Sequence, residues 1–324
     1  MLRRHAIAAI TLGGITGLAA CRDSLSAAPT DLPQLDLDCS ANDGVASVDL
    51  EDHFVFGGGG CRIHVIETGD RSGQPILFIH GFSQSALTWL PQLTSDLAHR
   101  YHLVAMDLRG HGASDRPGGG YDSSELWAAD VHGVIQELSL EQPILCGWSY
   151  GPLVMLDYVR YHGEAEIGGL HVVDGLTKLG SPAASDVLTP ELLALVPGFF
   201  STDAETSVNA LQSLLRLAYL HAPSAADLYT LLGFNVSVPP FVRHAMFSRT
   251  IDNDDLLPRI RKPLLITHGA SDAVVKLDVV EQMRRLVSQA EIQVIPNAGH
   301  APFADDAPTF NRRLAAFADT VRRR

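Results

Sequence analysis

Short apolar runs alternate with helix-like stretches along this chain, and this rhythm constrains its fold more than any other feature. Continuous apolar runs are typical of strands buried on both faces of a parallel sheet. The runs lie at 76–79, 103–106, 144–146, 170–173, 264–267 and 292–295, and the helical patterns at 123–138, 153–162 and 309–322. The sequence therefore predicts an α/β fold with a mostly parallel central sheet flanked by helices.

Two further segments complete the predicted organisation. Residues 48–56 and 62–67 read as two strands joined across a run of four glycines. Residues 176–258 break the strand rhythm, because helical patterns separated by prolines dominate there. We therefore predict a core made of residues 46–175 and 259–324, with a helical cap over 176–258.

The first residues resemble an export signal. Arg3 and Arg4 precede an apolar stretch over 6–20, which is too short to span a bilayer as a helix. Leu18–Cys21 resembles the lipobox of bacterial lipoproteins, a family in which this cysteine carries the lipid. We expect a signal peptide over 1–20, a lipid anchor on Cys21 and a tether over 21–45.

Export and charge restrict the partners of the protein. A lipidated chain is expected in the cell envelope, bound to the outer membrane or a periplasmic face if the source has two membranes. The net charge of −13, without a basic run, argues against nucleic-acid binding through phosphates. Nothing in the sequence fixes the oligomeric state.

The chain contains four cysteines, and an exported protein can form disulfides. Cys39 and Cys61 precede most of the predicted core, and a bridge between them would stabilise the fold by about 3 kcal/mol. Two free thiols are the alternative. Cys146 lies within an apolar run and is expected to be a small buried side chain.

A Gly-x-Ser-x-Gly pentapeptide, Gly147–Gly151, stands between a predicted strand and a predicted helix. A serine on such a tight turn is held in an exposed, strained position, and the flanking glycines relieve crowding. The helix N-terminus behind the turn favours developing negative charge. Ser149 is therefore the candidate nucleophile.

A serine nucleophile needs a base. His300 lies in a loop after the last predicted strand, and Asp272 follows the strand before it. Both loops fall at the carboxyl edge of a parallel sheet, where catalytic groups gather. The order Ser149, Asp272, His300 is that of α/β-hydrolase triads. Asp174, at the end of another strand, is a less favoured alternative for the acid.

No metal or other cofactor is expected. His80 and His111 stand in no recognised metal-ligand spacing, and the chain contains no His-Glu-x-x-His motif.

These motifs together resemble the α/β-hydrolase fold family, in its serine esterase and haloperoxidase-like branch. The segment His80-Gly81-Phe82, followed by Trp89, resembles the family's oxyanion-hole loop. The segment Asp107–Asp115 resembles its Asp-x-Arg-Gly-x-Gly-x-Ser turn. The resemblance covers residues 48–175 and 260–322, and it is more specific for the fold than for the substrate.

The resemblance implies acyl transfer. Ser149 would attack a carbonyl, His300 would accept its proton, and the backbone N–H groups of Phe82 and Tyr150 would hold the oxyanion. Trp148 is a candidate pocket residue.

Hydrolysis of a small carboxylic ester through an acyl-enzyme is the favoured function. C–C bond hydrolysis and cofactor-free perhydrolysis, which can use the same triad, are alternatives within the fold. A non-catalytic binding lipoprotein is an alternative of another class.

Overall fold

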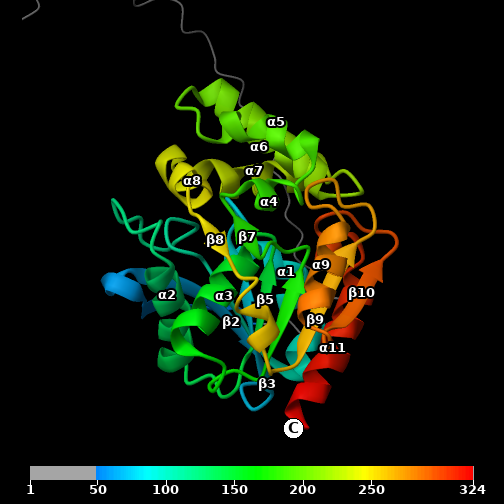
Figure 1. The fold of residues 1–324 in the computed structure, drawn as a ribbon. Helices are drawn as coiled ribbons and strands as arrows, with labels where there is room; N and C mark the ends of the chain where they lie inside the picture. Colours follow the sequence, from blue (N-terminus) through cyan, green and yellow to red (C-terminus); the bar gives the residue numbers. More distant parts are fainter. Residues whose placement is uncertain (1–48, 324) are drawn as a thin grey trace, which may run out of the picture. The chain divides into compact units, whose positions relative to one another are not determined.

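The computed structural model describes residues 49–323, and the statements below concern this part of the chain. An eight-stranded sheet forms its centre, in the order β1-β2-β4-β3-β5-β6-β9-β10 (Figure 1). β1 pairs antiparallel with β2 and β2 with β4, whereas the other neighbours are parallel. The strands are β1 (Glu51–Phe56), β2 (Arg62–Gly69), β3 (Gln74–Ile79), β4 (Tyr101–Met106), β5 (Ile144–Trp148), β6 (Gly169–Val173), β9 (Leu264–Gly269) and β10 (Glu291–Ile295). The predicted fold class, a mostly parallel sheet, is confirmed.

Helices cover both faces of this sheet. In β3, Leu77 and Ile79 belong to one hydrophobic cluster, and Ile76 and Phe78 to another. Because successive strand residues point to opposite faces, the two clusters lie on opposite sides of the sheet. α2 (Ser124–Glu137), α3 (Gly151–His162) and α9 (Asp278–Leu286) contribute to the first cluster, whereas α1 (Leu90–Leu93) and α11 (Ala307–Arg322) contribute to the second.

Two of these helices begin where a side chain caps them. The Ser123 hydroxyl accepts a hydrogen bond from the N–H of Leu126 at 3.3 Å, and α2 follows. Asp306 accepts one from the N–H of Thr309 at 3.1 Å, at the start of α11. Such caps satisfy N–H groups that have no partner inside the helix.

The segment between β6 and β9 is mainly helical and lies above the carboxyl ends of the parallel strands (Figure 1). Its elements are β7 (Lys178–Leu179), α4 (Pro182–Ser185), α5 (Pro190–Phe199), α6 (Ala204–Ala218), α7 (Ala225–Ser237), α8 (Pro240–Phe247) and β8 (Ile251–Asp252). β7 and β8 pair antiparallel and bring the two ends of the helical segment together. The sequence did not predict this two-stranded sheet. We call residues 176–258 the cap.

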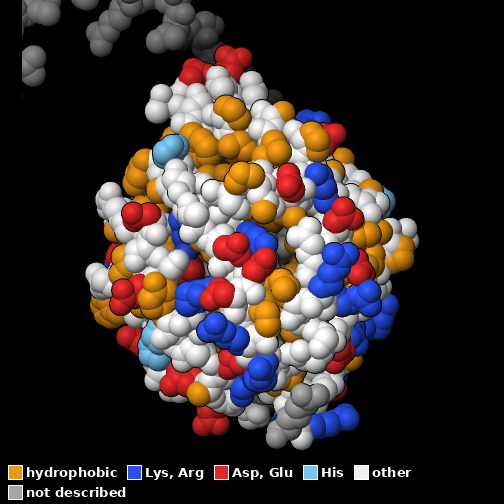
Figure 2. Space-filling view, in the orientation of Figure 1, with side chains coloured by type: hydrophobic (Ala, Val, Ile, Leu, Met, Phe, Trp, Pro, Cys, Tyr) orange, Lys and Arg blue, Asp and Glu red, His pale blue; other side chains and the backbone are white. Residues whose placement is uncertain are grey.

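A buried arginine joins the cap helices. Arg243 donates to the main-chain oxygens of Phe199 at 2.7 Å and Asn235 at 3.1 Å, and to the Ser207 hydroxyl at 2.9 Å. Burial lowers its pKa to about 10, so the guanidinium still carries its charge at neutral pH. The outer surface of the cap carries hydrophobic side chains (Figure 2). Leu193 and Tyr229 are exposed residues of the cap helices α5 and α7.

Several predictions fall outside the described residues. These are the signal peptide over 1–20, the lipidation of Cys21 and the tether over 21–45. No helix among residues 49–323 is long and apolar enough to cross a membrane. Cys61 is a buried free thiol, but Cys39 is not described, so their disulfide stays a prediction. Cys146 is fully buried in β5.

Candidate active site

Ser149 occupies the turn between β5 and α3. Its φ of +58° is in the left-handed region, which costs energy for a residue with a side chain. Its N–H donates to the main-chain oxygen of Val173 at 2.9 Å, and its own carbonyl accepts from the N–H of Leu176 at 3.0 Å. These bonds to the last residue of β6 and to the loop that follows it hold the strained turn in place.

Glycines are required around this turn because the backbone passes very close to its neighbours. A Cβ at Gly147 would lie 2.8 Å from the carbonyl carbon of Gly151, and one at Gly151 would lie 2.4 Å from the oxygen of Ile79. At Gly81 it would lie 2.9 Å from the Cβ of Ser149. The two glycines of the pentapeptide thus have the steric role that the sequence indicated.

The structure brings the three predicted triad residues together. His300 Nε2 is 2.9 Å from Ser149 Oγ, and His300 Nδ1 is 2.8 Å from Asp272 Oδ2. With the proton on Nδ1, the histidine donates to Asp272 and accepts from the serine hydroxyl. A neutral histidine in this tautomer is the general base that acyl transfer requires.

The Asp272 carboxylate is held by more than the histidine. Its Oδ1 accepts from the N–H groups of Val274 at 2.7 Å and Val275 at 2.9 Å. Burial opposes ionisation of this carboxyl, but its electrostatic interaction with the His300 ring and the hydrogen bond from that ring outweigh burial, so the pKa of Asp272 lies below the ordinary value. Asp272 is therefore ionised at neutral pH and can stabilise an imidazolium.

The two predicted oxyanion donors flank the serine in the pocket lining. The main-chain N–H groups of Phe82 and Tyr150 donate to no other group within residues 49–323. Phe82 also contributes its ring, which packs edge-on against Phe247 of the cap at 4.8 Å between centroids.

His80 supports the oxyanion loop. Its Nε2 accepts from the N–H of Leu108 at 3.0 Å, and its Nδ1 donates to the carbonyl of Gly81 at 2.7 Å. Burial lowers the pKa of His80, which keeps the ring neutral as this pair of bonds requires. The His111 ring packs against the His80 ring in a tilted arrangement, with 5.0 Å between the ring centroids and 53° between the ring planes. Both histidines thus have structural partners in the loops beneath the site.

The loop that carries His300 is fixed from two sides. The indole N–H of Trp148 donates to the main-chain oxygen of His300 at 2.6 Å. Asp305 accepts from the N–H of Gly299 at 2.8 Å and from the N–H of Leu220, in the cap, at 3.0 Å. Trp148 lies at the border of the pocket but is only 2% exposed, and its indole also holds the His300 loop.

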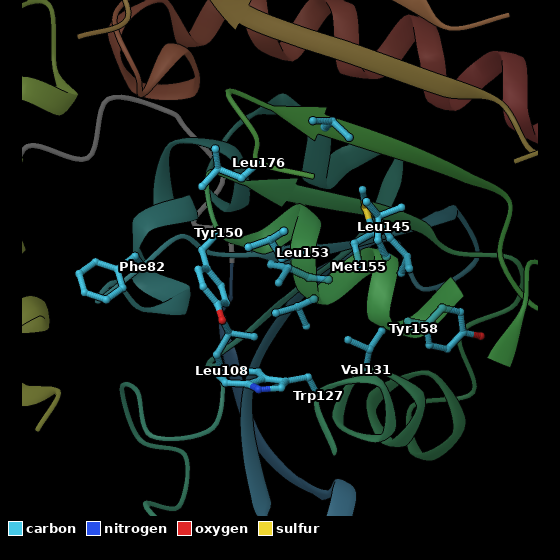
Figure 3. Packing of buried hydrophobic residues seen from close by; sticks show 14 of the residues in the cluster. Phe82, Leu108, Trp127, Val131, Leu145, Tyr150, Leu153, Met155, Tyr158 and Leu176 are labelled. Atoms are coloured by element: carbon cyan, nitrogen blue, oxygen red, sulfur yellow. The ribbon is translucent and has the colours of Figure 1, made fainter. Parts of the chain in front are cut away.

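A further link, which the sequence did not reveal, joins the nucleophile turn to the cap. The Tyr150 side chain extends from the turn toward Leu108 and Trp127 (Figure 3). Its hydroxyl donates to the carbonyl of Met246, in α8, at 3.2 Å and accepts from Arg249 at 3.1 Å. Arg249 also pairs with the buried Asp157 at 2.5 Å. No local motif marks Arg249, since its role depends on contacts across 99 residues.

The pocket over Ser149 is narrow, with a cavity volume of about 40 Å³. Apart from Ser149 and His300 its lining is nearly all apolar, and among the described residues no Lys, Arg, Asp or Glu lines it. Gln84 is the exception: its Oε1 accepts from the Thr88 hydroxyl at 3.3 Å, which leaves its Nε2 for a ligand. The cap supplies apolar residues Leu176, Leu179, Leu188, Leu192, Phe199, Leu214, Ala218 and Phe247.

Comparisons with known proteins identify relatives of the same fold. A family model described as alpha/beta hydrolase fold matches residues 74–307. The solved structure of an esterase from Rhodococcus sp. ECU1013 is 33% identical, with a TM-score of 0.79, over 83% of this chain and 99% of that chain.

Curated relatives span more than one chemistry. A non-heme haloperoxidase from Rhodococcus erythropolis is 30% identical over 82% of this chain and 99% of its own length. A 2-hydroxy-6-oxo-2,4-heptadienoate hydrolase from Pseudomonas putida is 25% identical over 75% of this chain and 87% of its own. With a family model over most of its length and an esterase of the same architecture, this chain is a hydrolase that belongs to the alpha/beta hydrolase fold family.

Proposed function

We propose that this protein hydrolyses uncharged carboxylic esters through an acyl-enzyme on Ser149. The observation that carries the proposal is the continuous hydrogen-bonded line from Ser149 through His300 to Asp272. A serine hydroxyl is a weak nucleophile, and this arrangement is the one that activates it.

The proposed reaction has two halves. His300 Nε2 takes the proton of Ser149 as its Oγ attacks the ester carbonyl, while Asp272 stabilises the imidazolium. The N–H groups of Phe82 and Tyr150 bind the oxyanion, and each such donor contributes about 3 kcal/mol to transition-state stabilisation. His300 then protonates the leaving alcohol. A water molecule, deprotonated by His300, releases the acid.

The apolar lining favours esters over the C–C bond alternative. The Pseudomonas putida relative is named for a dienoate, which is a carboxylate anion. Burying an anion without a partner is costly, and among the described residues no Lys or Arg lines this pocket. In perhydrolysis, hydrogen peroxide would replace water as the nucleophile that attacks the same acyl-enzyme. Peracid formation in the presence of hydrogen peroxide therefore serves as a second assay of the acyl-enzyme.

A series of p-nitrophenyl esters tests the proposed substrate class. We expect kcat/KM to rise about fourfold per added methylene from acetate upward until the pocket is full, because each buried methylene contributes about 0.8 kcal/mol. The hemisuccinate ester, whose acyl group is charged, should be the poorest substrate. A preference for the charged ester would contradict the proposal.

Two tryptophan variants of neighbouring cap residues test whether the acyl chain of the substrate lies against the cap. Leu192 lines the pocket and is 4% exposed, whereas its neighbour Leu193 is 40% exposed. Leu192→Trp should lower the chain length at which kcat/KM stops rising, and Leu193→Trp should leave it unchanged. Identical profiles for both variants would place the acyl chain elsewhere.

We also propose that the mature protein is a cell-envelope lipoprotein anchored through Cys21. The support is the Leu18–Cys21 lipobox after a short apolar segment. Expressed in its host with a labelled fatty acid, the wild-type chain should carry label and sediment with membranes. Cys21→Ala should lose the label, and Cys146→Ala should keep it. Label retained by Cys21→Ala would exclude this anchor.

A further inference from the structure

Asp174 is a fully buried carboxyl behind the triad that the proposed reaction does not use. It follows β6, the strand between the β5 turn of Ser149 and the β9 loop of Asp272. Its N–H donates to the oxygen of Thr267 at 2.9 Å, and its φ is +42°. The sequence suggested it as a rival acid, but in the structure His300 is hydrogen-bonded to Asp272.

One oxygen of Asp174 has a partner and the other does not. Oδ1 accepts from the N–H of Gly269 at 2.8 Å. Oδ2 is buried and has no hydrogen-bond donor among residues 49–323. One carboxylate oxygen of Asp174, one of Asp272 and one ring nitrogen of His300 all lie within 4.8 Å of one another. Two buried carboxylates this close repel each other, so a proton or a cation is needed between them.

The hydrogen bonds indicate which carboxyl holds the proton. Asp272 accepts from two N–H groups and from His300, whereas Asp174 accepts from one N–H group. More donors favour the ionised form, so the charge belongs on Asp272. Consistently, burial and the charge of Asp272 raise the pKa of Asp174 well above its ordinary value.

The other titratable groups here do not supply a compensating positive charge. His268 is fully buried, with Nδ1 3.5 Å from Asp174 and Nε2 3.5 Å from Asp272. Burial lowers its pKa, so it is neutral and can donate from Nε2 to the oxygen of Val275 at 3.2 Å. Asp305 adds further negative charge to the surroundings of Asp174.

We propose that Asp174 is a positioning residue that keeps its proton at neutral pH and donates it from Oδ2 to the Asp272 carboxylate. This inference rests on the proposed function, in which Asp272 orients His300. The extra donor fixes the Asp272 carboxylate in the orientation that His300 requires. The proton on Asp174 also limits the two carboxyl groups, Asp174 and Asp272, to one negative charge in total.

Kinetics of two variants test the positioning role. Asp174→Asn retains an N–H donor and should preserve kcat to within about threefold, whereas Asp174→Ala should lower kcat by about 10- to 100-fold, the range for losing one hydrogen bond to a charged group. KM should change little, because Asp174 does not line the pocket. Equal losses in both variants, or no loss in Asp174→Ala, would overturn the proposal.

Infrared difference spectra detect the proton directly. Wild type minus Asp174→Asn should show the C=O stretch of a protonated carboxylic acid at neutral pH. The same band should appear when Ser149→Ala is the parent, so the readout does not depend on turnover. A missing band would refute the proposal. If dialysis against EDTA then lowered kcat, a bound cation would be the neutralising group.

Thermal unfolding gives a second readout that needs no substrate. In the unfolded chain Asp174 ionises above about pH 4, whereas the folded protein keeps it protonated. The wild type therefore loses stability as pH rises above the unfolded pKa, and Asp174→Asn lacks this loss. The Tm of the variant relative to wild type should rise from about pH 5 to about pH 8. A constant difference would argue against a buried proton on Asp174.

Discussion

Ser149→Ala should lower kcat for p-nitrophenyl ester hydrolysis by about 10⁶-fold, the loss seen when a triad serine is removed elsewhere. The variant retains the oxyanion donors and the pocket, so a residual rate above the uncatalysed reaction is expected. Substrate binding should persist, because the apolar lining does not include the lost hydroxyl. The measurement is the steady-state rate on a short-chain ester, together with burst kinetics in the wild type.

The control for this experiment is Ser185→Ala. Ser185 is exposed in α4, where its hydroxyl donates to the main-chain oxygen of Ser181 at 3.2 Å. Its removal should leave kcat unchanged. Equal ester hydrolysis in the wild type and Ser149→Ala would eliminate the serine mechanism. No turnover of any ester by the wild type would favour C–C hydrolysis or a binding function.

The inner strands of the central sheet could be predicted because they are buried on both faces. A strand such as β3 has no solvent-facing positions, so its sequence is a short apolar run, and this signal is local. The Ser149 turn is equally local, since the glycines at 147 and 151 are set by contacts within one strand–turn–helix unit. The three triad residues could be predicted because each lies in the turn or loop that follows a predicted strand.

The features that could not be predicted depend on contacts between distant segments. The β7–β8 pair consists of two-residue strands that only tertiary structure brings together. Arg249 stabilises the Tyr150 side chain from 99 residues away. The place of Asp174 between Ser149 and Asp272 follows from the strand order β5-β6-β9, which local patterns do not encode.

Asp272→Asn should lower kcat by about 10⁴-fold with little effect on KM. The asparagine amide can donate to Nδ1 of His300, which would place the histidine proton on Nε2. That tautomer cannot accept the proton of Ser149, and the imidazolium would also lose its counter-charge. The loss corresponds to about 5.5 kcal/mol of transition-state stabilisation.

The control is Asp278→Asn, six residues further along the chain, where the aspartate is exposed at the start of α9. It should retain wild-type kcat, which separates the role of Asp272 from a general effect of charge loss.

Because the pKa of Asp272 lies below its ordinary value, this group stays ionised, and its titration should not change wild-type activity between about pH 5 and 8. A small loss in Asp272→Asn would mean that another group orients His300. Asp174 is the nearest candidate, so Asp272→Asn combined with Asp174→Asn would then show the larger fall in kcat.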